Sequence, residues 1–116
     1  FGFKYGIPND SGLVCEVRFL PNPYYLEALR SHTGQEAGVQ AYVRHGGTAD
    51  RFLSMLYGML DFLIPNYVQE GKNQLVIAIG CTGGRHRSVT VANALYQHLS
   101  GLEEYGLKIE HRDIGR

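Results

Sequence analysis

The chain has 116 residues, of which 44% are hydrophobic and 19% are charged, proportions that suit one compact domain with a core of its own. Eleven Lys and Arg residues balance eleven Asp and Glu residues, so the domain lacks the basic surface typical of many nucleic-acid-binding proteins. No apolar run is long enough to span a bilayer, and no signal peptide is visible, so we expect no membrane partner.

The two cysteines indicate a reducing compartment. Cys15 and Cys81 are far apart and form no C-x-x-C pair, so neither a disulfide framework nor a zinc site is indicated. We expect reduced thiols in a cytoplasmic protein, with Cys15 in the core. The chain starts at Phe1 without a Met, inside a segment with the pattern of a strand, which favours a fragment of a longer protein.

The first half of the chain predicts two strands and two short helices. Alternating aromatic residues predict a strand over residues 1–5, and a second strand is expected over residues 13–19. The L-P-N-P connection that follows should be stiff and extended. A short helix is predicted over residues 24–30, and another follows Thr33 and Glu36, which have the spacing of a capping box.

The longest predicted helix begins at Thr48, its cap, and stops at Gly71. Pro65 removes one internal hydrogen bond and is expected to kink it. Apolar residues recur at steps of three and four, which indicates a buried stripe. That stripe is predicted to comprise Phe52, Leu56, Met59, Leu60, Leu63 and Tyr67.

The last part of the chain predicts a strand, a helix and a further strand. Residues 75–79 are the most apolar segment, as expected for a strand buried on both faces. A helix is predicted from Ser88, as its N-cap, to a cap glycine at Gly101. A final strand is expected over residues 107–112. Alternating strands and helices predict a single three-layer α/β domain over residues 1–116, with a mainly parallel sheet of roughly four strands.

The turn between the third strand and the last helix carries the strongest functional signal. It reads G-C-T-G-G-R-H-R-S, a glycine-rich turn that leads from a buried strand to a helix start. Free backbone N–H groups and the helix dipole favour an anion there, and two arginines add charged donors. We therefore expect a phosphate-bearing small molecule to contact Cys81, Thr82, Gly83, Gly84, Arg85, His86, Arg87 and Ser88.

A second segment is expected to reach the same place. Ligands of parallel sheets bind beyond the carboxyl ends of the strands, and Arg18, Asn22 and Tyr24 follow the second strand. We expect these three residues to complete the binding site. A plainer interpretation stays open, in which the glycines only satisfy turn geometry, Ser88 is only a helix cap and Tyr24 only packs.

Two other functions also stay open. Cys81, Arg87 and Ser88 have the C-x5-R-S spacing of cysteine-dependent phosphatases, in which a thiolate attacks phosphorus and an arginine clamps the phosphoryl oxygens. Asp113 is a candidate general acid for that reaction. Alternatively, an RNA-binding or protein-docking module would use one basic face formed by Arg85, His86, Arg87, His111, Arg112 and Arg116.

The motifs G-C-T-G-G-R-H-R-S-V, F-G-F-K-Y-G-I-P, V-R-F-L-P-N-P and H-R-D, in this order, closely resemble the C-terminal domain of the RapZ/YvcJ family. The resemblance implies a regulatory domain without catalysis of its own, in which Thr82, Gly83 and Arg87 contact an amino-sugar phosphate, with Tyr24 alongside. It also implies an N-terminal P-loop domain that binds ATP or GTP in an RNase adapter protein.

The same resemblance implies partners. Small regulatory RNAs and an endoribonuclease are expected to bind the whole protein, which we expect to be a homo-oligomer. No G-x-x-x-x-G-K-[ST] motif occurs in this chain, so no cofactor is expected in this domain itself.

Overall fold

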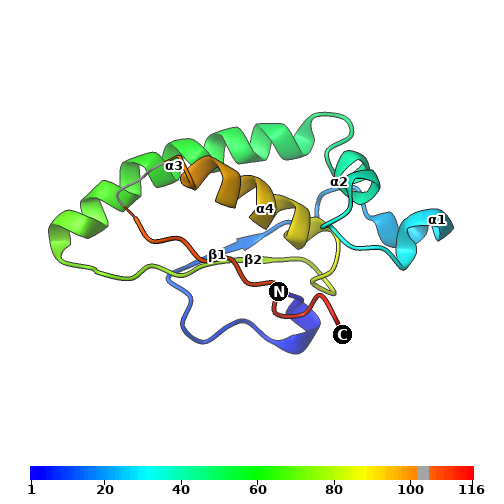
Figure 1. Cartoon of the computed structure of the whole chain (residues 1–116), viewed down its shortest axis with the longest axis horizontal. Coiled ribbons are helices and arrows are strands. Elements are labelled where there is room, and N and C mark those ends of the chain that lie inside the picture. Colours follow the sequence, from blue (N-terminus) through cyan, green and yellow to red (C-terminus); the bar gives the residue numbers. More distant parts are fainter. Residues whose placement is uncertain (102–104) are drawn as a thin grey trace.

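The computed structural model describes residues 1–101 and 105–116. Two short parallel strands lie beside a long helix and a shorter one, and the short helical segments between residues 23 and 43 lie at one end of the molecule (Figure 1). In chain order the elements are η1 (Phe3–Tyr5), β1 (Leu13–Glu16), η2 (Pro23–Tyr25), α1 (Glu27–Arg30), α2 (Ala37–Val43), α3 (Thr48–Glu70), β2 (Ile77–Gly80) and α4 (Arg87–Leu99).

The sheet confirms the α/β class and the parallel pairing, but not the number of strands. β1 pairs with β2 from Leu13 opposite Ile77 to Glu16 opposite Gly80, and Gly2 adds a single parallel bridge to Cys81. Within residues 1–101 and 105–116 the sheet therefore has two strands, where roughly four were expected. Helices α3 and α4 both lie on the same side of this sheet (Figure 1).

The prediction of a strand over residues 1–5 was wrong. Phe3–Tyr5 is a 3-10 helix that ends at Gly6, where φ is 89°. The alternating aromatics have another origin, because the rings of Phe1 and Phe3 pack edge to face, with centroids 4.8 Å apart. Both rings lie against Gly80, where an added Cβ would come within 2.5 Å of the Phe1 ring.

The prediction of a last strand over residues 107–112 was also wrong for the structure as described. These residues form no strand in the described structure, although they follow an extended course past β2 and α4 (Figure 1). A strand requires a ladder partner, and no neighbouring strand lies beside this segment in the described part of the chain. The predicted strand over residues 13–19 likewise ends early, at Glu16.

One hydrophobic core joins the sheet to helices α2, α3 and α4. The stripe that α3 buries consists of Ala49, Leu53, Leu56 and Leu60, at steps of three and four residues. Of the predicted stripe, Leu56 and Leu60 are buried and Met59 is 45% exposed. The other members, Phe52, Leu63 and Tyr67, are half-buried at the edges of the observed stripe. The core cluster comprises Val17, Leu20, Val39, Val43, Ala49, Leu53, Leu56, Leu60, Ile79, Cys81, Val91, Leu95 and Leu99.

Some helix ends agree with the predictions. Gly71 ends α3 with φ at 100°, as expected for a C-terminal glycine, and Pro65 lies inside this continuous helix. The Oε2 atom of Glu36 accepts a hydrogen bond from the Thr33 N–H at 3.0 Å, which is half of the predicted capping box. The bond closes a turn ahead of α2 rather than its first turn, because α2 begins at Ala37.

Other helix ends differ. Gly47, with φ at 85°, holds the N-cap position of α3, so Thr48 is a helical residue. Ser88 lies inside α4, whose N-cap is His86, and the C-cap of α4 is Ser100 rather than Gly101. The helix predicted over residues 24–30 is divided at Leu26, which ends η2 and precedes α1. Asn22 starts η2 by accepting a hydrogen bond from the Tyr24 N–H.

Candidate functional site

The loop from Cys81 to His86 connects the end of β2 to the start of α4, as the sequence predicted. Gly84 has φ at 79°, a conformation that other residues resist. A Cβ on Gly84 would lie 2.5 Å from the backbone nitrogen of Gly2, and one on Gly2 would lie 2.5 Å from the Gly83 carbonyl carbon. The start of the chain thus packs backbone against backbone on this loop.

Cys81 and Ser88 meet inside the loop. The Cys81 Sγ lies 3.3 Å from Ser88 Oγ and accepts a bond from the Ser88 backbone N–H at 3.5 Å, and Cys81 is only 3% exposed. Burial raises the pKa of the Cys81 thiol, but these Ser88 contacts, the Gly84 N–H and the charge of Arg87 together lower that pKa below its usual value. The loop therefore favours a negative charge at this point.

Arg87 serves the fold. Its side chain is buried, with 6% exposed, and its Nη1 donates hydrogen bonds to the backbone carbonyls of Arg18 and Leu20. The positive charge of Arg87 at the start of α4 is thus stabilised by carbonyl oxygens, and it does not by itself require a bound anion. Arg87 ties the loop to the segment after β1, so the two segments predicted to form one site do meet.

Arg85 and His86 attach the loop to the segment after α1. Arg85 Nη2 donates to the Ser31 carbonyl at 3.2 Å, and the Gly34 N–H donates to the Arg85 carbonyl at 2.8 Å. His86 Nε2 lies 3.1 Å from the Arg30 carbonyl. Burial lowers the pKa of His86, which favours its neutral form. The Nε of Arg85 is buried, and no group in the described part of the chain forms a hydrogen bond with it.

The exposed part of the loop is short. Thr82 is exposed, and an added Cβ on Gly83 would meet nothing within 4 Å. The carbonyls of Cys81 and Thr82 face the start of the chain, where they accept bonds from the N–H groups of Phe3 and Lys4. A ligand from solvent would thus first meet Thr82 and Gly83.

The second segment predicted for the site contains Arg18, Asn22 and Tyr24. Its backbone contacts the loop through Arg87, while the side chains of these three residues have other partners. Arg18 is exposed, pairs with Glu16 at 2.8 Å and lies over the Phe3 ring, and Asn22 is occupied in capping η2. Tyr24 is 55% exposed, and the Arg30 guanidinium lies 5.0 Å from its ring centre.

Two residues that hold this site together were not foreseen. Arg30 donates from Nε to the Tyr24 carbonyl at 2.6 Å, while its own carbonyl contacts His86, so it bridges η2 and the loop. Gly34 approaches α4 so closely that a Cβ there would lie 2.5 Å from the His86 carbonyl oxygen. Neither residue lies in a motif, and only the three-dimensional packing reveals them.

Asp113, singled out as a candidate general acid, is fully buried and has a structural role. Its carboxylate accepts a hydrogen bond from the Gly2 N–H at 2.8 Å and forms ion pairs with Arg112 and Arg116. Two cations of the predicted basic face are therefore already paired, and His86 and Arg87 are buried. The structure does not support one free basic face.

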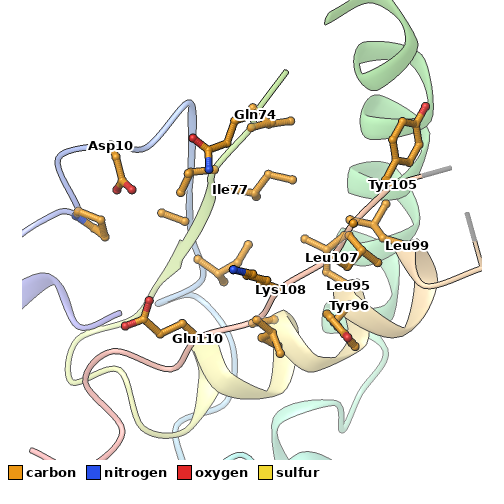
Figure 2. Close-up of a pocket in the computed structure, with 18 of the residues that line it drawn as sticks. Asp10, Gln74, Ile77, Leu95, Tyr96, Leu99, Tyr105, Leu107, Lys108 and Glu110 are labelled. Carbon is orange, nitrogen blue, oxygen red and sulfur yellow. The ribbon is translucent and has the colours of Figure 1, made fainter. Parts of the chain in front are cut away.

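A separate hollow lies away from this loop. A groove of about 970 Å³ runs between β2, α4 and residues 105–112, and neither Thr82 nor Gly83 lines it (Figure 2). Among residues 1–101 and 105–116, no three His, Cys, Asp or Glu side chains cluster in a way that could hold a metal ion. The described helices include none with the length and apolar character needed to cross a membrane.

The comparisons establish the family. A family model described as the RapZ C-terminal domain matches residues 1–115, and the chain belongs to this family. It is 64% identical over 116 residues to a nucleotide-binding protein of Agathobacter rectalis, and the match covers the whole chain and 40% of that relative. A nucleotide-binding protein of Lachnoclostridium phytofermentans is 61% identical over 114 residues, which cover 98% of the chain and 40% of the relative.

A third nucleotide-binding protein, from a Thermoanaerobacter species, is 59% identical over 115 residues, which cover 99% of the chain and 40% of its own length. The chain thus spans about 40% of the length of these relatives. Their names say that they bind nucleotides, and the family description places the matched region at the C-terminal end.

Proposed function

We propose that this domain binds a phosphorylated small molecule of the amino-sugar phosphate type at the loop from Thr82 to Ser88 and acts as a regulatory domain. The observation that carries the proposal is one unused, buried donor within the donor set of the loop. The Ser88 N–H donates to the Cys81 sulfur at 3.5 Å, and the Ser88 hydroxyl oxygen accepts from that thiol at 3.3 Å, beside the buried Arg87. Among residues 1–101 and 105–116, the Arg85 Nε of the same loop is a buried donor without an acceptor.

The Cys81 sulfur already accepts the hydrogen bond of the Ser88 N–H. The proposed phosphate therefore lies further out, on the exposed Thr82 and the unobstructed Gly83, with Arg85 supplying charge. Tyr24 and Arg30 form an exposed aromatic and cationic pair on the side of η2, and the proposal places the sugar portion of the ligand beside the Tyr24 ring.

The test is thermal unfolding of the chain with amino-sugar phosphates, other sugar phosphates, nucleotides and inorganic phosphate, followed by calorimetry on any ligand that raises Tm. Arg85→Gln should weaken binding at least tenfold, and Thr82→Ala several-fold. The matched control is Arg51→Gln on the exposed face of α3, which should bind like the parent. The proposal fails if no phosphorylated compound shifts Tm, or if Arg85→Gln and Arg51→Gln behave alike.

A second candidate is the cysteine-dependent phosphatase. The contacts of Ser88 with the Cys81 sulfur and the lowered pKa of that thiol favour it. The burial of Cys81 and the use of Arg87 on carbonyls disfavour it. A phosphatase would release phosphate from an aryl phosphate and lose that activity in Cys81→Ser, whereas a binding domain would show no turnover and keep its ligand affinity in that variant.

For the whole protein, the family supports three further proposals. The remaining part of the relatives binds ATP or GTP, small regulatory RNA and an endoribonuclease are partners, and the phosphorylated ligand changes the affinity of the protein for them. Titration of the full-length protein with nucleotide and RNA, with and without phosphosugar, tests this coupling. Equal affinities for nucleotide and RNA in both conditions would refute it. A steep fall of the RNA affinity with rising salt concentration would indicate binding through the RNA phosphates.

A further inference from the structure

The groove beside β2 has the shape of a missing strand. One wall is the backbone of residues 73–79, and the opposite wall is the extended segment of residues 105–112 (Figure 2). Its floor is apolar and comes from α4, through Ala92, Leu95 and Leu99. The volume is about 970 Å³.

The wall formed by β2 is an open sheet edge. Leu13 N–H donates to the Val76 carbonyl and Val17 N–H to the Gly80 carbonyl, so the even-numbered residues of this strand face β1. By the alternation of a parallel ladder, Ile77 and Ile79 direct their backbone groups to the opposite edge, toward the groove. In the described part of the chain, β1 is the only strand that pairs with β2.

The start of the chain already forms the end of such a strand. The Phe1 nitrogen donates to the Ile79 carbonyl at 2.8 Å, and the Cys81 N–H donates to the Phe1 carbonyl at 3.1 Å. Gly2 pairs in parallel with Cys81, so in the same register the first preceding residue would lie opposite Ile79 and the fifth opposite Leu75. That path runs along the groove.

The opposite wall ends at the same point. The Asp113 carboxylate accepts the Gly2 N–H at 2.8 Å, so residues 107–112 run toward Gly2 from the far side of the groove.

The comparison with the relatives indicates which segment could fill the groove. This chain covers 40% of the Agathobacter rectalis protein, and the family description assigns it to the C-terminal end. The relatives therefore carry further residues ahead of the position that corresponds to Phe1. An extended segment that adds to a sheet edge is held by main-chain hydrogen bonds, whatever its side chains.

We propose that the residues preceding Phe1 in the full-length protein add a parallel strand to the open edge of β2, fill this groove and pair on their other side with residues 107–111. The sheet would then have four parallel strands, in the order β1, β2, the added strand and residues 107–111. Residues 107–111 alternate like a strand yet lack a ladder because their neighbour is this segment. The inference does not depend on the phosphate site.

The test compares this 116-residue chain with the same chain extended at Phe1 by the ten residues that precede the matched region in the Agathobacter rectalis protein. Amide hydrogen exchange is followed by NMR. We expect the amides of Ile77 and Ile79 to become at least about tenfold more protected in the extended chain. The amides of Ala78 and Gly80, which face β1, serve as internal controls and should change much less.

A second variant keeps the experiment decisive if the shorter chain folds poorly. Proline at the second and fourth preceding positions removes the N–H groups that would donate to the Ile77 and Leu75 carbonyls and breaks the added ladder, so protection of Ile77 and Ile79 should fall relative to Ala78 and Gly80. The inference is overturned if the Ile77 and Ile79 amides exchange equally fast in the 116-residue chain and in the extended chain. It is also overturned if they exchange equally fast in the extended chain with and without proline. It is also overturned if their protection rises with protein concentration, because a second copy would then occupy the edge.

Discussion

Arg87 and Asp113 are buried charges that organise the two sides of the loop. Arg87 donates to carbonyls 69 and 67 positions earlier, and Asp113 accepts from an N–H 111 positions earlier. Each therefore joins segments that are distant in sequence, and each charge is met by polar partners as burial requires. The sequence marked both residues as functional, but their first role is to hold the loop and the start of the chain in place.

Asp113 makes stability depend on pH. Burial raises the pKa of this carboxyl, but the hydrogen bonds from Arg112 and Gly2 and the nearby charges outweigh burial and lower that pKa below its usual value. A lowered folded-state pKa stabilises the fold above the unfolded-state value of about 4 and loses that contribution as pH falls through the folded-state value.

We therefore expect Asp113→Asn to have a smaller free energy of unfolding at pH 7 and a flatter dependence on pH between about 5 and 3. Urea unfolding at a series of pH values measures both. Asp10→Asn, at an exposed loop position, is the matched control and should follow the parent curve. Identical pH dependence in Asp113→Asn and the parent would contradict this assignment.

The elements differ in how far local sequence determined them. The strand, glycine turn and helix around residues 77–99 were predictable because apolar content, Gly84 and helical spacing are local signals. The segments at residues 1–5 and 107–112 were not, because an alternating pattern becomes a strand only beside a partner. The bridging role of Arg30 and the burial of Arg87 were equally invisible, since their acceptors lie in distant segments.

Two glycines near α2 have different roles: Gly34 allows close packing, whereas Gly38 only lowers the stability of the helix. Gly34 lies so close to the start of α4 that an added Cβ would come within 2.5 Å of the His86 carbonyl oxygen and 2.7 Å of the Val89 Cβ. Gly38 lies exposed in α2, where an added Cβ would meet only Leu29, at 3.7 Å.

We expect Gly34→Ala to destabilise the fold by roughly 1–3 kcal/mol through overpacking. Gly38→Ala should stabilise it by about 0.5–1 kcal/mol, because glycine is unfavourable inside a helix. Thermal and urea unfolding of both variants measure the difference. A neutral Gly34→Ala would show that the segment after α1 does not pack against the loop as described.

At the scale of the whole molecule, the start of the chain touches both the proposed ligand loop and the open sheet edge. Gly2 packs against Gly83 and Gly84, while Phe1 hydrogen-bonds to Ile79 on the edge of β2. A strand added ahead of Phe1 would therefore fix the backbone on which the loop rests. Ligand binding and strand addition should then assist each other, and the coupling must be reciprocal.

This coupling gives a prediction that rests on both proposals. The extended chain should bind its phosphorylated ligand several-fold more tightly than the 116-residue chain, and the ligand should raise the protection of the Ile77 and Ile79 amides by a comparable factor. Calorimetry on both chains and hydrogen exchange with and without ligand measure the two sides. Gly2→Ala, whose Cβ would lie 2.5 Å from the Gly83 carbonyl carbon, should reduce the coupling. Equal ligand affinities in both chains would show that the loop and the sheet edge act independently.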